Sequence, residues 1–195
     1  MAKAALSIDV ISDVVCPWCY IGKRRLEGAL RLYREQHPGS PAPEVRWWSF
    51  QLNPDMPAAG IDRGTYLEQK FGTANMAVIY ARVAAACREV GIPFAFDRVV
   101  RQPNTLVAHS LVALAGLHGM LEAVFRAYFI GGEDLTQEDA LLRIAVGAGL
   151  AEAAVRECLA DPEMRAQTAH GGRARPRAWR GGRTTLHLQP PHRGI

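Results

Sequence analysis

Apolar and polar positions follow two different periods near the start of the chain. Residues 7–15 and 44–52 each mix apolar residues with single polar ones over a short span, which predicts two mostly buried strands. Between them, residues 18–36 carry apolar side chains at helical spacing with Lys and Arg in the gaps, which predicts a helix with one buried face. Strand, helix and strand in this order form the unit from which parallel sheets are built.

The pattern changes after the polar stretch at residues 54–64. Helical periodicity then dominates, with joints at residues 91–93 and 101–104. Because roughly 100 residues of helix follow a single strand–helix–strand unit, we predict an inserted helical subdomain. The predicted helices are 66–71, 75–90, 105–118, 121–130, 138–148 and 151–160.

The end of the chain follows neither period. Residues 171–183 consist largely of Gly and Arg without apolar periodicity, which predicts a disordered or basic arm that cannot complete a sheet. We therefore divide the chain into an N-terminal α/β half (1–60), a helical subdomain (61–165) and an atypical basic tail (166–195).

Composition narrows the class of protein. The 195 residues are 49% hydrophobic and 22% charged, the balance of an ordinary globular protein. No apolar run approaches the roughly 18 residues that a membrane span needs, so we expect no membrane partner. The first residues lack the pattern of a signal peptide, from which we expect a cytoplasmic location. In a reducing compartment, a close cysteine pair is more often catalytic or metal-binding than a structural disulfide.

The net charge of +4 is unevenly distributed. Residues 1–164 contain 16 of the 23 Lys and Arg residues and all 19 acidic residues, a net charge of −3. The basic character therefore belongs to the tail and is no argument that the whole protein binds nucleic acid. Nucleic-acid recruitment by the tail is the alternative from a different functional class, and it predicts salt-sensitive DNA binding that truncation at Arg165 abolishes.

The tetrapeptide Cys16-Pro17-Trp18-Cys19 lies at the predicted junction of strand and helix. A thiol is nucleophilic as its thiolate, and first-turn N–H groups with the helix dipole stabilise an anion at Cys16. Cys19, one turn further along, can resolve a mixed disulfide. Pro17 suits the first turn of a helix, and Trp18 adds an aromatic surface beside the sulfur. A Cys-x-x-Cys motif in this setting indicates redox chemistry, with Cys16 and Cys19 as the catalytic residues.

The cysteines allow two other interpretations, a zinc site and buried structural residues. A zinc site needs two further ligands, and no second Cys-x-x-Cys or paired His with ligand spacing is present, so we predict no metal. Cys87 and Cys158 stand alone in helical segments, where each is expected to be a small buried hydrophobic residue. Cys16 and Cys19 could likewise be buried structural residues, but the strand–turn–helix setting favours the redox interpretation.

Four motifs together closely resemble the FrnE-like branch of the DsbA family, over about residues 7 to 165. The resemblance implies an α/β, thioredoxin-like fold with a large all-helical insertion and dithiol–disulfide exchange on protein or small-molecule thiols. It implies no cofactor beyond the redox-active disulfide, with glutathione as a possible co-substrate, and it carries no information on oligomeric state. The matching stretches are Asp13–Lys23, Phe50–Pro54, Asn104–His109 and Phe125–Phe129 followed by Gly132–Leu135.

The resemblance also assigns roles. It implies that Cys16 attacks, that Cys19 resolves, and that Asn53, Asn104 and His109 line the substrate cleft. Each of the last three has a structural alternative: a turn before Pro54 for Asn53, a helix cap for Asn104, and helix packing for His109.

The related 2-hydroxychromene-2-carboxylate isomerases and kappa-class glutathione transferases typically have Ser where Cys16 stands, and they lack the second cysteine. Retention of both thiols favours an oxidoreductase. A glutathione-dependent isomerase or transferase is the alternative.

The tail departs from the family. Its members return to the thioredoxin core through a Gly-Val-Pro loop with a cis-proline, followed by two strands and a helix. Here the prolines after residue 165 are Pro176, Pro190 and Pro191, in a different context.

The C-terminal part of the thioredoxin core is therefore missing or frameshifted. Codons for residues 180–189, read one nucleotide later, permit Val-Glu-Gly-Val-Pro-x-Phe-Ile-Phe-Asn, and a frameshift near residues 168–171 would produce this tail. A genuine tail predicts a marginally stable family member with weak or no exchange activity.

Overall fold

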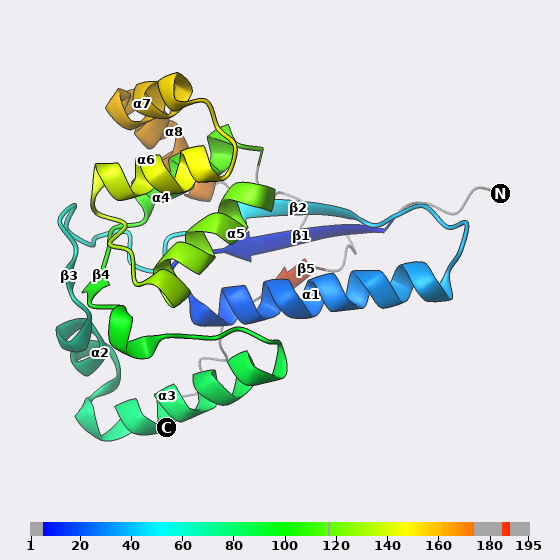
Figure 1. The fold of residues 1–195 in the computed structure, drawn as a ribbon, viewed down its shortest axis with the longest axis horizontal. Helices are drawn as coiled ribbons and strands as arrows, with labels where there is room; N and C mark the ends of the chain where they lie inside the picture. Colours follow the sequence, from blue (N-terminus) through cyan, green and yellow to red (C-terminus); the bar gives the residue numbers. More distant parts are fainter. Residues whose placement is uncertain (1–5, 117, 174–184, 188–195) are drawn as a thin grey trace.

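The computed structural model describes residues 6–116, 118–173 and 185–187. Its centre is a parallel strand pair, β1 (Ser7–Ser12) and β2 (Glu44–Ser49), joined by helix α1 (Pro17–Gln36). The register runs from Ser7 opposite Glu44 to Ser12 opposite Ser49. Parallel strands need a crossover connection, and α1 provides it, lying along the sheet in Figure 1. The predicted strand–helix–strand unit is confirmed.

Both strands end earlier than predicted. The strand predicted at 7–15 stops at Ser12, because Asp13 begins a turn in which the Cys16 N–H donates to the Asp13 carbonyl oxygen at 3.1 Å. The strand predicted at 44–52 stops at Ser49, although the Phe50 N–H still donates to the Ser12 carbonyl oxygen at 3.0 Å. The chain therefore leaves both strands at the same end of the sheet, beside the start of α1.

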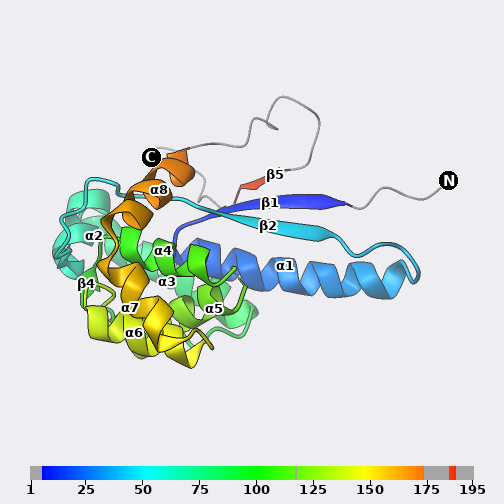
Figure 2. The same cartoon turned by 90° about the horizontal axis from the view of Figure 1, so that it is seen from above.

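Apolar side chains of both strands pack toward α1. Ile8, Val10 and Trp47 are buried and share one core cluster with Leu26 of α1. Figure 2 shows α1 running beneath β1 and β2, on one side of the strands. The start of α1 is thus held by packing against the sheet as well as by the turn before it.

Helices fill the segment between β2 and the tail, and Figure 1 shows most of them gathered beyond the carboxyl ends of the strands. This is the predicted helical insertion. It also contains a short 3₁₀ segment, η1, and a π-helical segment, η2. The elements are β3 (Ile61–Asp62), α2 (Arg63–Phe71), α3 (Thr73–Glu89), η1 (Phe96–Arg98), β4 (Arg101–Gln102), α4 (Leu106–Leu114), α5 (His118–Arg126), η2 (Ala127–Gly131), α6 (Glu138–Gly147) and α7 (Glu152–Ala160).

Three features of this subdomain differ from prediction. The helix predicted at 105–118 ends at Leu114, since Gly116 adopts a φ of +65° that a right-handed helix excludes. The helix predicted at 121–130 changes to π-helical hydrogen bonding after Arg126. Strands β3 and β4 form an antiparallel pair that two-residue segments gave no pattern to predict. This short strand pair joins segments of the insertion that are about 40 residues apart in the sequence.

Contacts between α1 and α5 tie the insertion to the sheet domain. The Tyr20 ring stacks on Phe125 with centroids 4.9 Å apart. Beside them, Glu122 accepts a hydrogen bond from the Tyr20 hydroxyl at 3.0 Å and pairs with the buried Lys23 at 2.8 Å. Because Tyr20 directly follows Cys19, this contact holds the first turns of α1 against the helical subdomain.

The tail contains more regular structure than predicted. Helix α8 (Pro162–Arg173) crosses the division predicted at residue 165, and it starts where the Asp161 side chain accepts the Glu163 N–H at 2.7 Å. Strand β5 (Thr185–His187) follows the arm predicted at 171–183 and pairs in parallel with β1 at Asp9–Ile11, so the tail adds a strand to the sheet. An open strand edge offers N–H and C=O groups to any extended segment, whatever its side chains. The rest of the predicted basic arm, from residue 174, lies outside the described residues.

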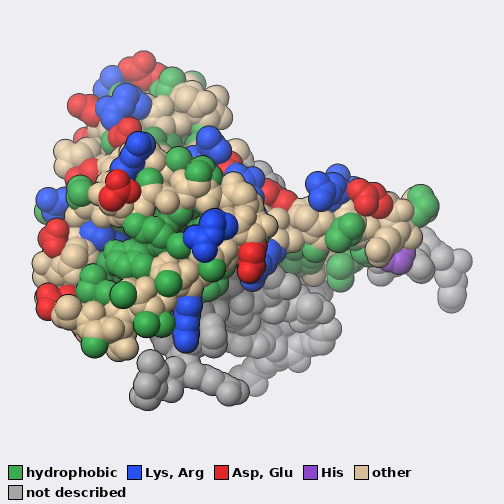
Figure 3. All heavy atoms as spheres, turned by 60° about the horizontal axis from the view of Figure 1, so that its bottom comes forward, with side chains coloured by type: hydrophobic (Ala, Val, Ile, Leu, Met, Phe, Trp, Pro, Cys, Tyr) green, Lys and Arg blue, Asp and Glu red, His purple; other side chains and the backbone are tan. Residues whose placement is uncertain are grey.

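Helix α3 presents apolar side chains to solvent as well as to the core. Figure 3 shows hydrophobic side chains gathered on the side of the molecule that carries α3. Phe71, at the end of α2, and Val78 of α3 are 37% and 52% exposed. Among the described helices, none combines the length and the apolar character needed to cross a membrane.

Candidate active site

The motif Cys16 to Cys19 lies where β1 passes into α1. Cys16 is the N-cap residue of α1, with φ −94° and ψ 112°, and Pro17 occupies the first turn. The Cys16 carbonyl oxygen accepts the N–H of Cys19 at 3.0 Å and that of Tyr20 at 3.3 Å. This geometry places the Cys16 side chain at the positive end of the helix dipole, as the sequence predicted.

Both motif cysteines are thiols, and no disulfide joins them. Cys16 is 2% exposed and Cys19 is 4% exposed, while Trp18 between them is partly buried against the core. A disulfide substrate therefore reaches the Cys16 sulfur only when the side chains that cover it move.

The environment shifts the two pKa values in opposite directions. The pKa of Cys16 is lowered, chiefly because the Cys19 thiol donates a hydrogen bond to its sulfur, and backbone N–H groups of Cys19 and Trp18 add to this effect. Burial and the charge of Asp13 oppose it. The pKa of Cys19 is raised well above its usual value by that same hydrogen bond, by burial and by the charge on Cys16. Of the two thiols, Cys16 is therefore the one that ionises more readily.

A buried carboxylate lies directly before the motif. Asp13 is 1% exposed, and its Oδ2 accepts the Leu52 N–H at 2.7 Å. Its Oδ1 lies 3.3 Å from Nε2 of His109 and 3.5 Å from the Val15 N–H. Asp13 thus joins the loop of residues 13–16 that leads into α1, here called the motif loop, to the chain after β2 and to helix α4. Sequence reasoning treated Asp13 only as part of a motif, although a charge inside an otherwise apolar run was a signal of its role.

His109 is the one predicted cleft residue in contact with the motif loop. It is 2% exposed on α4, and its Nε2 also lies 3.1 Å from the Phe50 carbonyl oxygen. The histidine therefore reaches the cysteines through Asp13, and its full burial fits the packing alternative as well. A direct role in a substrate cleft stays a prediction.

The family of the chain follows from a match over most of its length. Residues 7–172 match the DsbA-like thioredoxin domain, which covers the sheet unit, the motif and the helical insertion. The chain belongs to the DsbA-like thioredoxin domain family. A relative, the uncharacterized protein YwbO of Bacillus subtilis (strain 168), is 26% identical over 156 residues, which are 78% of this chain and 70% of that protein.

Solved structures agree with this family. A probable DsbA oxidoreductase from Streptomyces coelicolor is 29% identical and superposes with a TM-score of 0.76, over 91% of this chain and 76% of that one. The cytosolic disulfide reductase DsbM from Pseudomonas aeruginosa, solved with GSH, is 21% identical with a TM-score of 0.55, over 91% and 83% of the two chains. A 2-hydroxychromene-2-carboxylate isomerase shares the fold at 14% identity and a TM-score of 0.58, over 86% and 78%.

Asn53, in the segment after β2, belongs to a polar cluster with side chains of α2. Its side-chain amide donates to the Tyr66 hydroxyl at 3.0 Å, and Lys70 donates to the same hydroxyl at 2.6 Å. The guanidinium of Arg63 lies 5.5 Å from the Tyr66 ring centroid. In this DsbA-like chain Asn53, after β2, thus contacts one cation of α2, Lys70, while Arg63 lies over the ring of the shared tyrosine. Sequence reasoning missed Tyr66, Lys70 and Arg63, because helical periodicity alone does not indicate which polar face lies near a site.

Asn104 acts as a structural residue. Its Oδ1 accepts the Leu106 N–H at 2.9 Å at the start of α4, and its amide donates to the Met56 carbonyl oxygen at 2.6 Å. Gln51 also donates to Oδ1 at 3.3 Å. The N-cap residue of α4 is Thr105, so Asn104 stands one residue before the cap and orders the turn that leads into the helix. A direct contact of Asn104 with substrate stays a prediction.

The other two cysteines are buried, as predicted. Burial raises the pKa of Cys87 to about 11. The pKa of Cys158 is also raised by burial, and its thiol lies 3.4 Å from the Met164 sulfur. Neither thiol has the helix N-terminus that serves Cys16. Within the described residues, no three His, Cys, Asp or Glu side chains come together as metal ligands.

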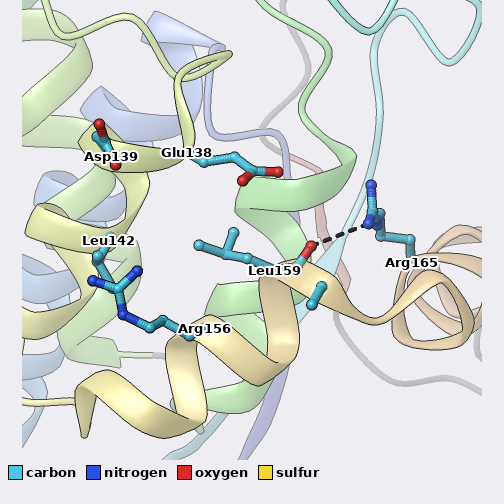
Figure 4. A pocket seen from close by; sticks show the side chains of 7 residues that line it. Glu138, Asp139, Leu142, Arg156, Leu159 and Arg165 are labelled. Atoms are coloured by element: carbon cyan, nitrogen blue, oxygen red, sulfur yellow. Dashed lines mark hydrogen bonds between the residues drawn. The ribbon is translucent and has the colours of Figure 1, made fainter.

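A surface hollow between α6, α7 and α8 is separate from the motif. Figure 4 shows its charged lining, with Glu138 and Asp139 on α6 and Arg156 on α7. Arg156 is already paired with Glu152 at 2.6 Å, and Arg165 donates to the Leu159 carbonyl oxygen at 3.0 Å. The hollow is lined by no thiol, and both of its arginines have partners.

Proposed function

We propose that the chain is a dithiol–disulfide oxidoreductase or isomerase of the FrnE-like branch, acting through Cys16 and Cys19. The observation that carries the proposal is the placement of Cys16 as the N-cap residue of α1, with the Cys19 N–H bonded to its carbonyl oxygen at 3.0 Å. The lowered pKa of Cys16 and the raised pKa of Cys19 fit this placement. This division gives one thiol the charge needed for attack and leaves the other protonated until it is needed.

The exchange proceeds in two steps. The Cys16 thiolate attacks one sulfur of a substrate disulfide, forming a mixed disulfide and releasing the other substrate sulfur as a thiolate. Cys19 then loses its proton and attacks the Cys16 sulfur, which releases the second substrate thiolate and leaves a Cys16–Cys19 disulfide. Two electrons pass from the dithiol to the substrate, and the reverse sequence oxidises a substrate dithiol.

The same geometry sets the order of the two steps, so that Cys19 attacks after the mixed disulfide has formed. In the dithiol, the negative charge of Cys16 contributes to the raised pKa of Cys19. Once Cys16 is part of a mixed disulfide that charge is gone, so one cause of the raised pKa disappears and Cys19 deprotonates more readily. Resolution is thus favoured only after the first attack has taken place.

We propose protein or small-molecule thiols and disulfides as partners and the cytoplasm as the location. Glutathione is the small-molecule candidate, supported by the likeness to DsbM, a cytosolic disulfide reductase solved with GSH. Lys70, which contacts Asn53, and Arg63, over the same Tyr66 ring, provide positive charge in the segment after β2 for a carboxylate of such a peptide.

A second candidate is a glutathione-dependent isomerase or transferase. It is favoured by the fold shared with 2-hydroxychromene-2-carboxylate isomerase. In that chemistry Cys16 alone would contact the glutathione sulfur, and Cys19 would have no role as a resolving thiol. The two candidates therefore differ in what they require of Cys19.

Cys19→Ser is expected to trap the first intermediate. With oxidised glutathione, the variant should accumulate close to one equivalent of a Cys16–glutathione mixed disulfide, because the residue that resolves it is gone. Intact-mass and peptide mass spectrometry measure the adduct and its position. The matched variant Cys16→Ser keeps Cys19 buried and should form little adduct.

An adduct on Cys87 or Cys158 in place of Cys16 would contradict the assignment of the attacking thiol. Full turnover of 2-hydroxychromene-2-carboxylate with glutathione by Cys19→Ser, without a trapped disulfide, would support the isomerase instead.

A further inference from the structure

The Asp13 carboxylate is surrounded by hydrogen-bond donors. Oδ2 accepts the Leu52 N–H at 2.7 Å, and Oδ1 faces the Val15 N–H at 3.5 Å and His109 Nε2 at 3.3 Å. Leu52 and Val15 offer backbone N–H groups, which only donate. Both oxygens are therefore used as acceptors, the arrangement of an ionised carboxylate.

The tautomer of His109 follows from its second contact. Nε2 lies 3.1 Å from the Phe50 carbonyl oxygen, which can only accept, so Nε2 carries a hydrogen. Nδ1 is buried and has no hydrogen-bond partner among the described residues. A proton there would create a buried cationic donor without an acceptor, which is costly. The ring is therefore neutral, and it orients the Asp13 carboxylate without cancelling its charge.

Asp13 and the attacking thiol belong to one buried turn. The Cys16 N–H donates to the Asp13 carbonyl oxygen at 3.1 Å, which closes the turn between the two residues, and both side chains are buried. Charges in a buried setting are weakly screened, and the charge of Asp13 raises the pKa of Cys16 against the hydrogen bonds that lower it. The buried cation of α1, Lys23, is bound by Glu27 and Glu122.

We propose, building on the thiol–disulfide exchange proposed above, that Asp13 is a positioning residue, held by His109, that makes the Cys16–Cys19 disulfide a weaker oxidant. A negative charge beside Cys16 disfavours its thiolate, and whatever disfavours the thiolate disfavours the reduced form. The relevant equilibrium is one protein disulfide plus two glutathione thiols giving one protein dithiol plus oxidised glutathione, a two-electron transfer. Asp13 moves this equilibrium toward the protein disulfide.

Asp13→Asn tests the proposal. Removing the charge should shift the glutathione equilibrium roughly tenfold toward the protein dithiol. The Cys16 thiolate absorbance at 240 nm should also titrate at lower pH in the reduced variant. A residue with a purely structural role would move the free energy of unfolding but neither of these readouts in this direction. Asp13→Glu, which keeps the charge, should return both toward wild type.

A matched control is available on the same strand. Asp9 is also a buried carboxylate of β1, but it pairs with Arg46 at 2.9 Å and accepts from Trp48 at 3.1 Å, both on β2. Asp9→Asn should leave the glutathione equilibrium within about twofold of wild type, because its charge is already paired. Asp13→Ser provides a second neutral variant if Asp13→Asn folds poorly.

The outcomes separate this proposal from the one it rests on. A wild-type chain that forms no Cys16–Cys19 disulfide in oxidised glutathione would overturn the proposed function. A wild-type chain that titrates normally, with Asp13→Asn and Asp13→Ser unchanged within twofold or shifted toward the disulfide, would overturn the role of Asp13 alone.

Discussion

Cys16→Ser is expected to abolish disulfide exchange, lowering the rate of insulin reduction by dithiothreitol at least roughly 10³-fold toward the uncatalysed rate. Cys16 is the thiol whose pKa is lowered, and a serine hydroxyl cannot form a disulfide. Cys19 cannot substitute for it, because burial raises its pKa. Turnover is measured by insulin precipitation with each variant at equal concentration.

The position of Cys16 means that this substitution should remove the thiol without disturbing the fold. It is the N-cap residue of α1, and its side chain makes no capping hydrogen bond. Serine is among the most favoured N-cap residues, so the variant should fold at least as well as wild type. The buried Cys87, outside the motif, provides the control: Cys87→Ala should retain turnover within about twofold per folded molecule. Retention of a tenth or more of the turnover by Cys16→Ser would place the nucleophile elsewhere.

Phe125→Ala is expected to have the largest effect on stability, lowering the free energy of unfolding by about 3–5 kcal/mol. Phe125 has no exposed surface, stacks on Tyr20 at 4.9 Å and lies 6.1 Å from the Phe129 ring. Truncation removes these contacts and leaves a cavity between α1 and α5. Since domains of this kind have roughly 5–15 kcal/mol in total, the variant should be close to unfolding. Urea denaturation followed by circular dichroism measures the change.

The consequence reaches the active site through Tyr20. This residue follows Cys19 directly, so loss of its stacking partner loosens the first turns of α1. The exposed Val146 of α6 provides the comparison, and Val146→Ala should change stability by less than about 0.5 kcal/mol. A loss below about 1 kcal/mol for Phe125→Ala would show that α5 does not pack on α1 as described.

The parts of the fold that local patterns specify were predictable. Two short apolar runs around an amphipathic helix define β1, α1 and β2, and the tetrapeptide marks the junction at which α1 begins. Helical periodicity also located most of the insertion. Boundaries were less accurate, because the turn at Asp13 and the end of α4 at Leu114 depend on backbone hydrogen bonds and on Gly116 rather than on hydrophobic pattern.

The long-range parts of the site were not predictable in the same way. Asp13 and His109 meet across 96 positions of sequence, and nothing local to either residue names the other. The Asn53–Tyr66 contact likewise depends on how α2 packs beside the chain after β2. In the tail, the three residues of β5 are too few to show a strand pattern, and strand pairing at an open edge uses backbone groups that every residue carries.

The central claim is that Cys16 and Cys19 form one redox couple, and equilibration of the wild-type chain in glutathione buffers tests it most directly. Thiols are quenched by acid and alkylation at each ratio of reduced to oxidised glutathione, and peptide mass spectrometry identifies the bridged pair. We expect a single two-electron transition from dithiol to a Cys16–Cys19 disulfide, with Cys87 and Cys158 remaining thiols throughout. A chain in which Cys16 and Cys19 stay reduced at every ratio, or in which only separate glutathione adducts form, would contradict it.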